Sequence, residues 1–243
     1  MRIFDVLGEA FAVYRRLFRR SVVVAGLIFA VVALAQALAA MSGTALALLV
    51  SLVLSLVGGL LVQGALVEVV RDLHEGREPA TVNTYYDRTR GRLGTLVGSS
   101  LIYGLGVVVG LILFVVPGLI AIARWSLIVP LVMIEGRGRR EAFRRSAELV
   151  RGQTGRILLL VVAANIVTAV VSVTVGSALG FIPGFLGTWV GGAVAGALAV
   201  PYQAHVLTVL YYRLTEPAVP ILPEPGQERW SSIWDEERTE GPE

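Results

Sequence analysis

Six long apolar runs, separated by short uncharged turns or by arginine-rich loops, dominate the sequence. A membrane-spanning helix needs about 20 mostly apolar residues to cross roughly 30 Å of hydrocarbon. Each run is of that order and holds almost no charge. We therefore predict six transmembrane helices, at about residues 21–41, 44–70, 95–115, 119–135, 157–182 and 188–212.

The connections between the runs alternate in character. The segments at 42–43, 116–118 and 183–187 are short, contain Gly, Pro or Ser, and carry no charge. Such segments are typical of tight turns between antiparallel neighbours. The pattern predicts an all-α integral membrane bundle in which the six transmembrane helices form three hairpins.

A short amphipathic segment precedes each hairpin. In the first segment, one apolar face is formed at helical spacing by Ile3, Leu7, Phe11, Tyr14 and Phe18. The segment before the third hairpin has a similar face, and the middle segment, 82–93, has a weaker one. We therefore expect three hairpin repeats, each with a cytoplasmic amphipathic helix and two spans that enter the membrane from the same side.

Composition and charge place the chain in a membrane. Hydrophobic residues make up 55% of it and charged residues 16%, whereas soluble domains have about 25% charged residues. All 21 basic residues are Arg, and 20 of them lie in the termini and long loops on one side of the predicted hairpins. The positive-inside rule then predicts a multi-pass protein of the cytoplasmic membrane with both termini in the cytoplasm.

A cleaved signal peptide is the alternative interpretation of the N-terminus. Residues 37–39, Ala-Leu-Ala, would provide a small-residue cleavage site. The apolar run before them exceeds the roughly 7–15 residues of a signal peptide, so we favour an uncleaved span.

The C-terminal segment 217–243 differs from the membrane domain, residues 1–216. It is Pro-rich up to Pro225, and it has two Arg against seven acidic residues. We expect an acidic cytoplasmic tail. Its apolar motif, Trp230, Ile233 and Trp234, either docks on the basic cytoplasmic face or belongs to a disordered end.

Signals for catalysis are weak. The chain has no Cys, which excludes disulfides and thiolate metal sites, and neither of its two His has another His at helical spacing. Nucleophile, phosphate-loop and dinucleotide motifs do not occur in a suitable context. The repeated Gly-x-x-x-Gly spacing, as at Gly106 and Gly110, is typical of close helix packing. We predict a protein that is not an enzyme and uses no metal or cofactor.

Polar residues inside the spans are candidate site residues. The predicted intramembrane polar site consists of Arg124, Gln203, His205, Asn165 and Gln63, near expected helix kinks at Pro130 and Pro201. Ionisable groups in a span indicate function by default. For Arg124 two structural alternatives stay open: its side chain extends to the membrane surface, or it binds carbonyls at a helix break. For the amides, hydrogen bonds between helices are the alternative.

The loop 136–156 is the most basic segment, with seven Arg against two acidic residues. A candidate lipid-facing basic helix in this loop presents Arg139, Arg140, Arg144, Arg145 and Arg151. Such a helix attracts anionic lipid headgroups at about 1 kcal/mol per basic residue. Because every span is flanked by Arg for topological reasons, we do not expect nucleic acid as a partner.

Three motifs carry a family resemblance. They are Ala-Arg-Trp-Ser-Leu-Ile-Val-Pro at 123–130, Glu-Gly at 135–136, and Arg-Arg-Ser-Ala-Glu-Leu-Val-Arg-Gly at 144–152. Over residues 1–215 the chain resembles the bacterial and archaeal glycerophosphoryl diester phosphodiesterase membrane domain and related domains of unknown function. The resemblance implies a helical membrane module and carries over no catalytic residue.

These observations favour a non-enzymatic membrane accessory or organising module that binds lipid or a membrane-protein partner. The alternative is a small-molecule transporter or channel with a cavity near Pro130 and Pro201. A continuous polar cavity would favour transport, and a core closed by Ala, Val and Leu would favour the accessory role. An intramembrane enzyme is the third and weakest hypothesis.

Overall fold

Helices account for most of the chain between residues 3 and 216, the part that the computed structural model describes, and no β-strand occurs there. The predicted acidic tail lies outside the described residues. In chain order the helices are α1 (Ile3–Arg16), α2 (Phe18–Ser42), α3 (Ala45–His74), α4 (Val82–Arg90), α5 (Leu93–Leu113), α6 (Val115–Arg124), α7 (Ile128–Ile134), α8 (Arg139–Leu149), α9 (Thr154–Leu179) and α10 (Phe185–Thr215).

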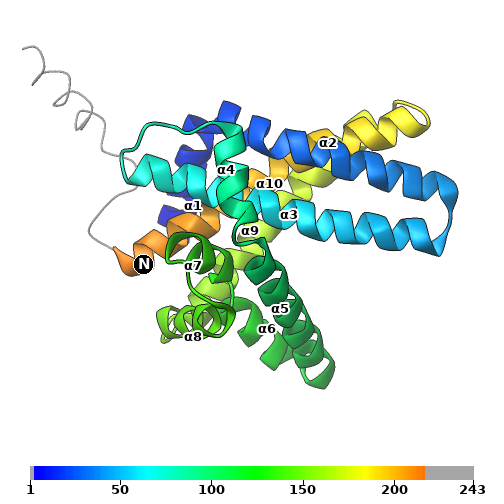
Figure 1. The fold of residues 1–243 in the computed structure, drawn as a ribbon. Coiled ribbons are helices and arrows are strands. Elements are labelled where there is room, and N and C mark those ends of the chain that lie inside the picture. The colour runs from blue at the N-terminus through cyan, green and yellow to red at the C-terminus, as the bar shows by residue number, and fades with distance from the viewer. Residues whose placement is uncertain (1–2, 217–243) are drawn as a thin grey trace, which may run out of the picture.

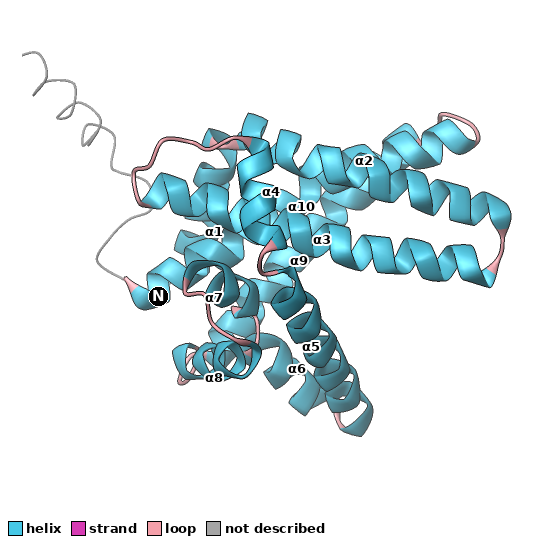
Figure 2. Ribbon diagram, in the orientation of Figure 1, coloured by secondary structure: helices cyan, strands magenta, loops and turns pink. Residues whose placement is uncertain are grey.

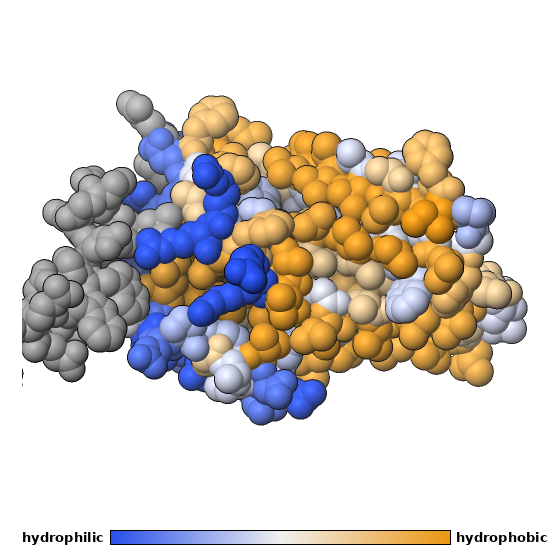
Figure 3. Space-filling view, turned by 90° about the horizontal axis from the view of Figure 1, so that it is seen from above, coloured by the Kyte–Doolittle hydropathy of each residue, from blue (hydrophilic) through white to orange (hydrophobic). Residues whose placement is uncertain are grey.

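Six segments are long and apolar enough to cross a membrane: α2, α3, α5, α6 together with α7, α9 and α10. Their outer surfaces carry large apolar side chains, such as Leu46, Ile112 and Phe181, which are 72%, 78% and 89% exposed. Figure 3 shows a broad apolar surface on one part of the molecule and hydrophilic residues gathered at one end. Because a surface this apolar is stable only in hydrocarbon, the chain is a membrane protein.

The second hairpin differs from the predicted one. The break between its two spans falls at Phe114, and Pro117 and Gly118 lie in the first turn of α6 instead of between the spans. Proline is accepted there because first-turn amides have no partner within the helix. The fourth span is also interrupted between Arg124 and Ile128, which separates α6 from α7.

A left-handed glycine lies in the first turn between spans, where the sequence predicts a tight connection. Gly43 has φ 61° and its N–H donates to the carbonyl of Ala39 over 3.1 Å. Glycine is favoured at this position because a Cβ destabilises the left-handed conformation. The hydroxyl of Thr44 then caps α3 by accepting from the backbone N–H of Ala47.

The helices diverge from one end of the molecule as two arms (Figures 1 and 2). In the larger arm, α10 packs against α2 and α9, and α2 packs against α3. The smaller arm is the hairpin of α5 and α6, which packs mainly on itself. It meets the larger arm through contacts of α6 with α9 and of α5 with α3.

Helix α1 lies against α10 and α9. The buried row is Val6, Ala10 and Val13, whereas Phe11 is 52% exposed. The predicted row of larger side chains lies beside this face. Smaller side chains allow a closer approach to α10, which explains why packing selects them.

Candidate functional site

A cavity of about 730 Å³ lies where the two arms meet. Its walls come from both arms and from the break between α6 and α7. The lining residues are Leu56, Leu60, Gln63, Ser100, Tyr103, Ile122, Trp125, Ser126, Ile128, Val129, Val161, Val162, Asn165, Ile166, Ala169, Gln203 and Leu207. The volume is within the range of about 300–1,000 Å³ that is usual for ligand sites.

Three of the predicted site residues meet in this cavity. Gln63 of α3, Asn165 of α9 and Gln203 of α10 all line it. The side-chain amide of Gln203 donates to Oδ1 of Asn165 over 3.2 Å, and Nδ2 of Asn165 donates to the carbonyl of Val161 over 2.7 Å. The cavity therefore has one polar wall of neutral amides, the amide cluster, among apolar side chains.

The amide cluster lies below the charged end of the bundle. At 1.5 Å per residue, Gln63 is about 12 Å along α3 from Arg71, and Gln203 is about 15 Å along α10 from Arg213. The cavity thus lies within the apolar part of the protein, in the half of the spans that is nearer to the arginine-rich end.

Arg124 does not join the cluster. Its side chain is exposed, and it has no hydrogen bond or ion pair among residues 3–216. No carbonyl among the described residues accepts a hydrogen bond from its guanidinium, although a helix break follows directly after it. Ser146 satisfies the break instead: its hydroxyl donates to the carbonyl of Arg124 over 2.6 Å and accepts from the N–H of Leu127 over 3.3 Å.

His205 also lies elsewhere. It is fully buried and its Nε2 is 2.9 Å from the hydroxyl of Ser21, so it links α10 to α2. The nearby hydroxyl of Tyr14 donates to the carbonyl of Leu198 over 2.9 Å. Pro201 is buried inside α10 between these contacts. These groups join α1, α2 and α10, and none of them lines the cavity.

Pro130 lies in the first turn of α7, directly after the break. It therefore marks the start of a helix and not a kink within one, because its missing N–H has no helical partner at that position. Trp125 occupies the break, lines the cavity and packs edge-on against Phe143 of α8, with 5.1 Å between ring centroids. The helix α8 thereby supports one wall of the cavity.

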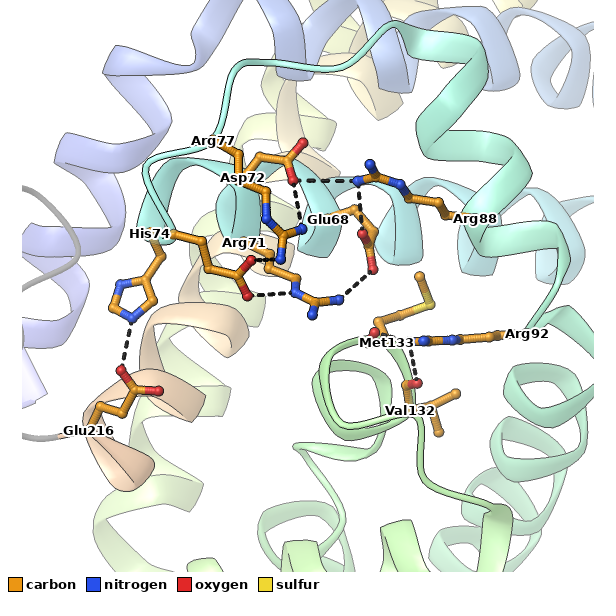
Figure 4. A network of polar contacts seen from close by, with 11 residues as sticks. Glu68, Arg71, Asp72, His74, Arg77, Arg88, Arg92, Val132, Met133 and Glu216 are labelled. Atoms are coloured by element: carbon orange, nitrogen blue, oxygen red, sulfur yellow. Dashed lines mark hydrogen bonds and ion pairs between the residues drawn. The ribbon is translucent and has the colours of Figure 1, made fainter. Parts of the chain in front are cut away.

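At the charged end, two buried carboxylates from α3 are paired with arginines (Figure 4). Glu68 lies 3.6 Å from Arg71 and 3.3 Å from Arg88, and Asp72 lies 3.4 Å from Arg88 and 3.6 Å from Arg77. Since Arg88 belongs to α4, this network fixes α4 on α3.

Two further contacts in Figure 4 tie this end together. Nε2 of His74 lies 3.1 Å from a carboxylate oxygen of Glu216, which joins the ends of α3 and α10. The guanidinium of Arg92 donates to the carbonyls of Val132 and Met133 near the end of α7. Helix ends leave such carbonyls without a partner, so Arg92 caps α7.

Two tyrosines of α4 are held in their neutral form at this end. Burial, together with the negative charge of Asp72, raises the pKa of Tyr85 to about 12. Burial raises the pKa of Tyr86, whose hydroxyl donates to the carbonyl of Val24. Within the described residues no group of three or more His, Asp or Glu could hold a metal ion.

The predicted basic helix is found as α8, and its arginines differ in environment. Arg139, Arg140 and Arg144 are exposed, as is Arg151 just after the helix. Arg145 is half-buried, 3.9 Å from Glu135. The opposite face of α8 is buried through Ala142 and Ser146 and fixes its orientation.

Sequence reasoning missed several residues of the site. Ser100, Tyr103, Trp125 and Ser126 line the cavity, and Ser146 holds the break beside it. Serine and aromatic residues are common in spans, so only the position of the break could have indicated them.

The comparisons identify a family but no characterised relative. No curated protein and no solved structure matches the chain significantly. A protein-family model matches residues 82–215. These residues contain α4 to α10 and therefore most of the cavity wall. The match shows no link to the glycerophosphoryl diester phosphodiesterase membrane domain. The chain belongs to the family described as a domain of unknown function (DUF7847).

Proposed function

We propose that this protein is a non-enzymatic membrane accessory module that gathers anionic lipid headgroups at its basic end. The observation that carries the proposal is α8. One face of this helix is buried, and the other presents Arg139, Arg140 and Arg144 to the surroundings.

The electrostatics of α8 support this role. Only one of its exposed arginines, Arg144, has an acidic partner on the helix, and Glu148 lies 3.9 Å away at the surface. Exposed pairs of this kind contribute about 0–1 kcal/mol, so they leave the arginine available. Each basic residue near an anionic membrane surface contributes about 1 kcal/mol of attraction.

We also propose that the protein lies in the cytoplasmic membrane in one defined orientation. The basic end, with α1, α4 and α8, faces the cytoplasm, and the turns at Gly43 and Phe114 face outward. The distribution of the arginines along the sequence supports this orientation.

We further infer that the chain consists of three repeats, each with a short amphipathic helix and two spans. The order of elements supports this inference, since α1, α4 and α8 each precede a pair of spans. The resemblance of residues 123–152 to the glycerophosphoryl diester phosphodiesterase membrane domain supports a module that accompanies another activity, in the membrane or on a fused domain.

Small-molecule transport is the second candidate function, and the cavity is the observation that favours it. The cavity adjoins Pro130, and its amide cluster includes Gln203, two residues after Pro201. Most of its lining is apolar, and the rest of the core is closed by residues such as Val62, Ala65 and Leu66. The accessory role is therefore preferred.

Lipid retention tests the main proposal. The full chain is placed in nanodiscs that contain phosphatidylcholine with a minor share of phosphatidylglycerol, and the lipids that stay bound are counted by native mass spectrometry. Replacement of Arg140, Arg144 and Arg151 by Gln should reduce retained phosphatidylglycerol about tenfold or more, given about 1 kcal/mol per charge.

The matched control replaces the same three arginines by Lys, which keeps the charge and should restore retention. Equal retention by the Gln and wild-type proteins would overturn the proposal. Loss in the Lys variant as well would show that guanidinium geometry, and not charge alone, selects the lipid.

A further inference from the structure

We propose that the cavity between the two arms binds an uncharged amphiphile. Its hydrocarbon chain occupies the apolar part of the cavity, and a hydroxyl or carbonyl group binds to the amide cluster. This site is separate from the basic surface of α8 and does not depend on anionic lipid binding there.

The lining excludes a charged ligand. None of the residues that line the cavity is Asp, Glu, Arg or His. A charged headgroup placed beside Gln63 or Asn165 would lack a counter-ion in an apolar environment, which costs several kcal/mol. Neutral hydrogen-bonding groups pay no such penalty, so the lining favours them.

Hydrogen-bonding groups in the cavity are available to a ligand. The amide of Gln63 and the hydroxyls of Ser100 and Tyr103 have no hydrogen-bond partner among the residues that the structure describes. Gln203 donates through Nε2 to Asn165 and so keeps its carbonyl oxygen free to accept. Polar groups in an apolar site are stabilised by a partner, and a hydroxyl can both donate and accept there.

The apolar part of the cavity continues to the membrane-facing surface. Leu56, Val162 and Ile166 line it and are 37%, 37% and 58% exposed on that surface. A hydrocarbon chain can therefore enter from the bilayer between the arms. Because the chain then moves from one apolar environment into another, its burial adds little free energy, and the polar contact decides which amphiphile is held.

Photolabelling tests the proposal. The probe is hexadecanol with a diazirine in its chain, added to the full-length protein in detergent micelles and crosslinked by light. We expect saturable labelling that maps by mass spectrometry to α3, α5 and α9, and competition by unlabelled hexadecanol. Hexadecanoate above its pKa and hexadecyltrimethylammonium, each with the same diazirine, should label these helices at least tenfold less.

Two pairs of variants separate the site from the rest of the surface. Gln63→Leu with Gln203→Leu should weaken hexadecanol labelling about tenfold, whereas Gln36→Leu should not, since Gln36 pairs with Ser55 outside the cavity. Ala169→Phe should fill the cavity and abolish labelling, whereas Ala178→Phe, at an exposed position of the same helix, should not. Melting temperatures confirm that each variant folds.

Equal labelling by the charged and neutral probes, or labelling spread evenly over all six spans, would overturn the proposal. Absence of saturable labelling would also overturn it and would assign the cavity to water or to packing. None of these outcomes bears on phosphatidylglycerol retention by α8, so the two proposals fail independently.

Discussion

The hydroxyl of Ser146 lies 2.6 Å from the carbonyl oxygen of Arg124, although the two residues belong to different helices. The same hydroxyl accepts from the N–H of Leu127, so one side chain satisfies both sides of the break between α6 and α7. A helix interruption inside a span is stable only when its backbone groups find such partners.

Ser146→Ala should therefore destabilise the protein. The carbonyl of Arg124 and the buried N–H of Leu127 would lose their partner, which costs about 1–3 kcal/mol. Thermal unfolding in detergent measures the effect, with Arg124→Lys as the comparison. The exposed guanidinium of Arg124 has no partner among the described residues, so this second variant should melt like the wild type. The opposite ranking would contradict the assignment of the break to Ser146.

Gly106 and Gly104 provide a matched pair on α5. A Cβ at Gly106 would lie 2.5 Å from the indole ring of Trp125, whereas a Cβ at Gly104 would meet nothing within 4 Å. Gly106→Val should push α5 away from the break between α6 and α7, beside the cavity, and cost about 1–3 kcal/mol. Gly104→Val should leave the melting temperature nearly unchanged. Similar melting of both variants would argue against close packing at Gly106.

Asp72 and Asp87 test the paired carboxylates at the basic end. Both pair with arginines, but the side chain of Asp72 is 3% exposed and that of Asp87 is 69% exposed. Asp72→Asn should lower the free energy of unfolding by about 1–3 kcal/mol, because Arg77 and Arg88 lose a buried charged partner. Asp87→Asn should change it by less than about 0.5 kcal/mol. Denaturation in mild detergent would distinguish them.

Ionisation of Tyr85 should lower the stability of the folded protein at alkaline pH. Its pKa is raised from 10.0 to about 12 in the folded protein. Its neutral form is favoured by folding, so this contribution is complete below pH 10 and is lost as the pH rises towards 12. Melting curves at pH 9 and pH 11 should show a decline that is smaller in Tyr85→Phe. A decline as large as that of the wild type would assign the effect to other groups.

Reporter fusions test the proposed orientation. Fusions at Gly76 and Gly138, in the arginine-rich loops, should report the cytoplasm. Fusions after Ser42, Phe114 and Pro183, in the uncharged connections, should report the opposite side. An outside signal at Gly138 would reject the topology.

The spans could be predicted because apolar length alone determines whether a helix crosses hydrocarbon. The amide cluster could also be predicted in part, because each of its members is an isolated amide within a span. His205 lies outside the amide cluster because it follows Gln203 by two residues. Two residues correspond to about 200° around a helix, so the two side chains point to opposite sides.

The break between α6 and α7 could not be predicted from local pattern. The residues from Trp125 to Leu127 contain neither Gly nor Pro that would end a helix, and the partner that stabilises the interruption comes from α8. The same holds for the pairing of Asp72 with Arg88, which depends on how α4 folds back on α3. Contacts between distant segments decide both cases.

The packing of α10 against α2 sets the order in which the protein can be completed. Ser21 and His205 are separated by 184 residues, so the first span is synthesised and inserted long before its main neighbour exists. During translation the hairpin of α2 and α3 must therefore reside in the lipid with its inner face unoccupied. A ribosome that stops before α10 would release a membrane-inserted but unfinished protein, which quality-control proteases could recognise by that open face.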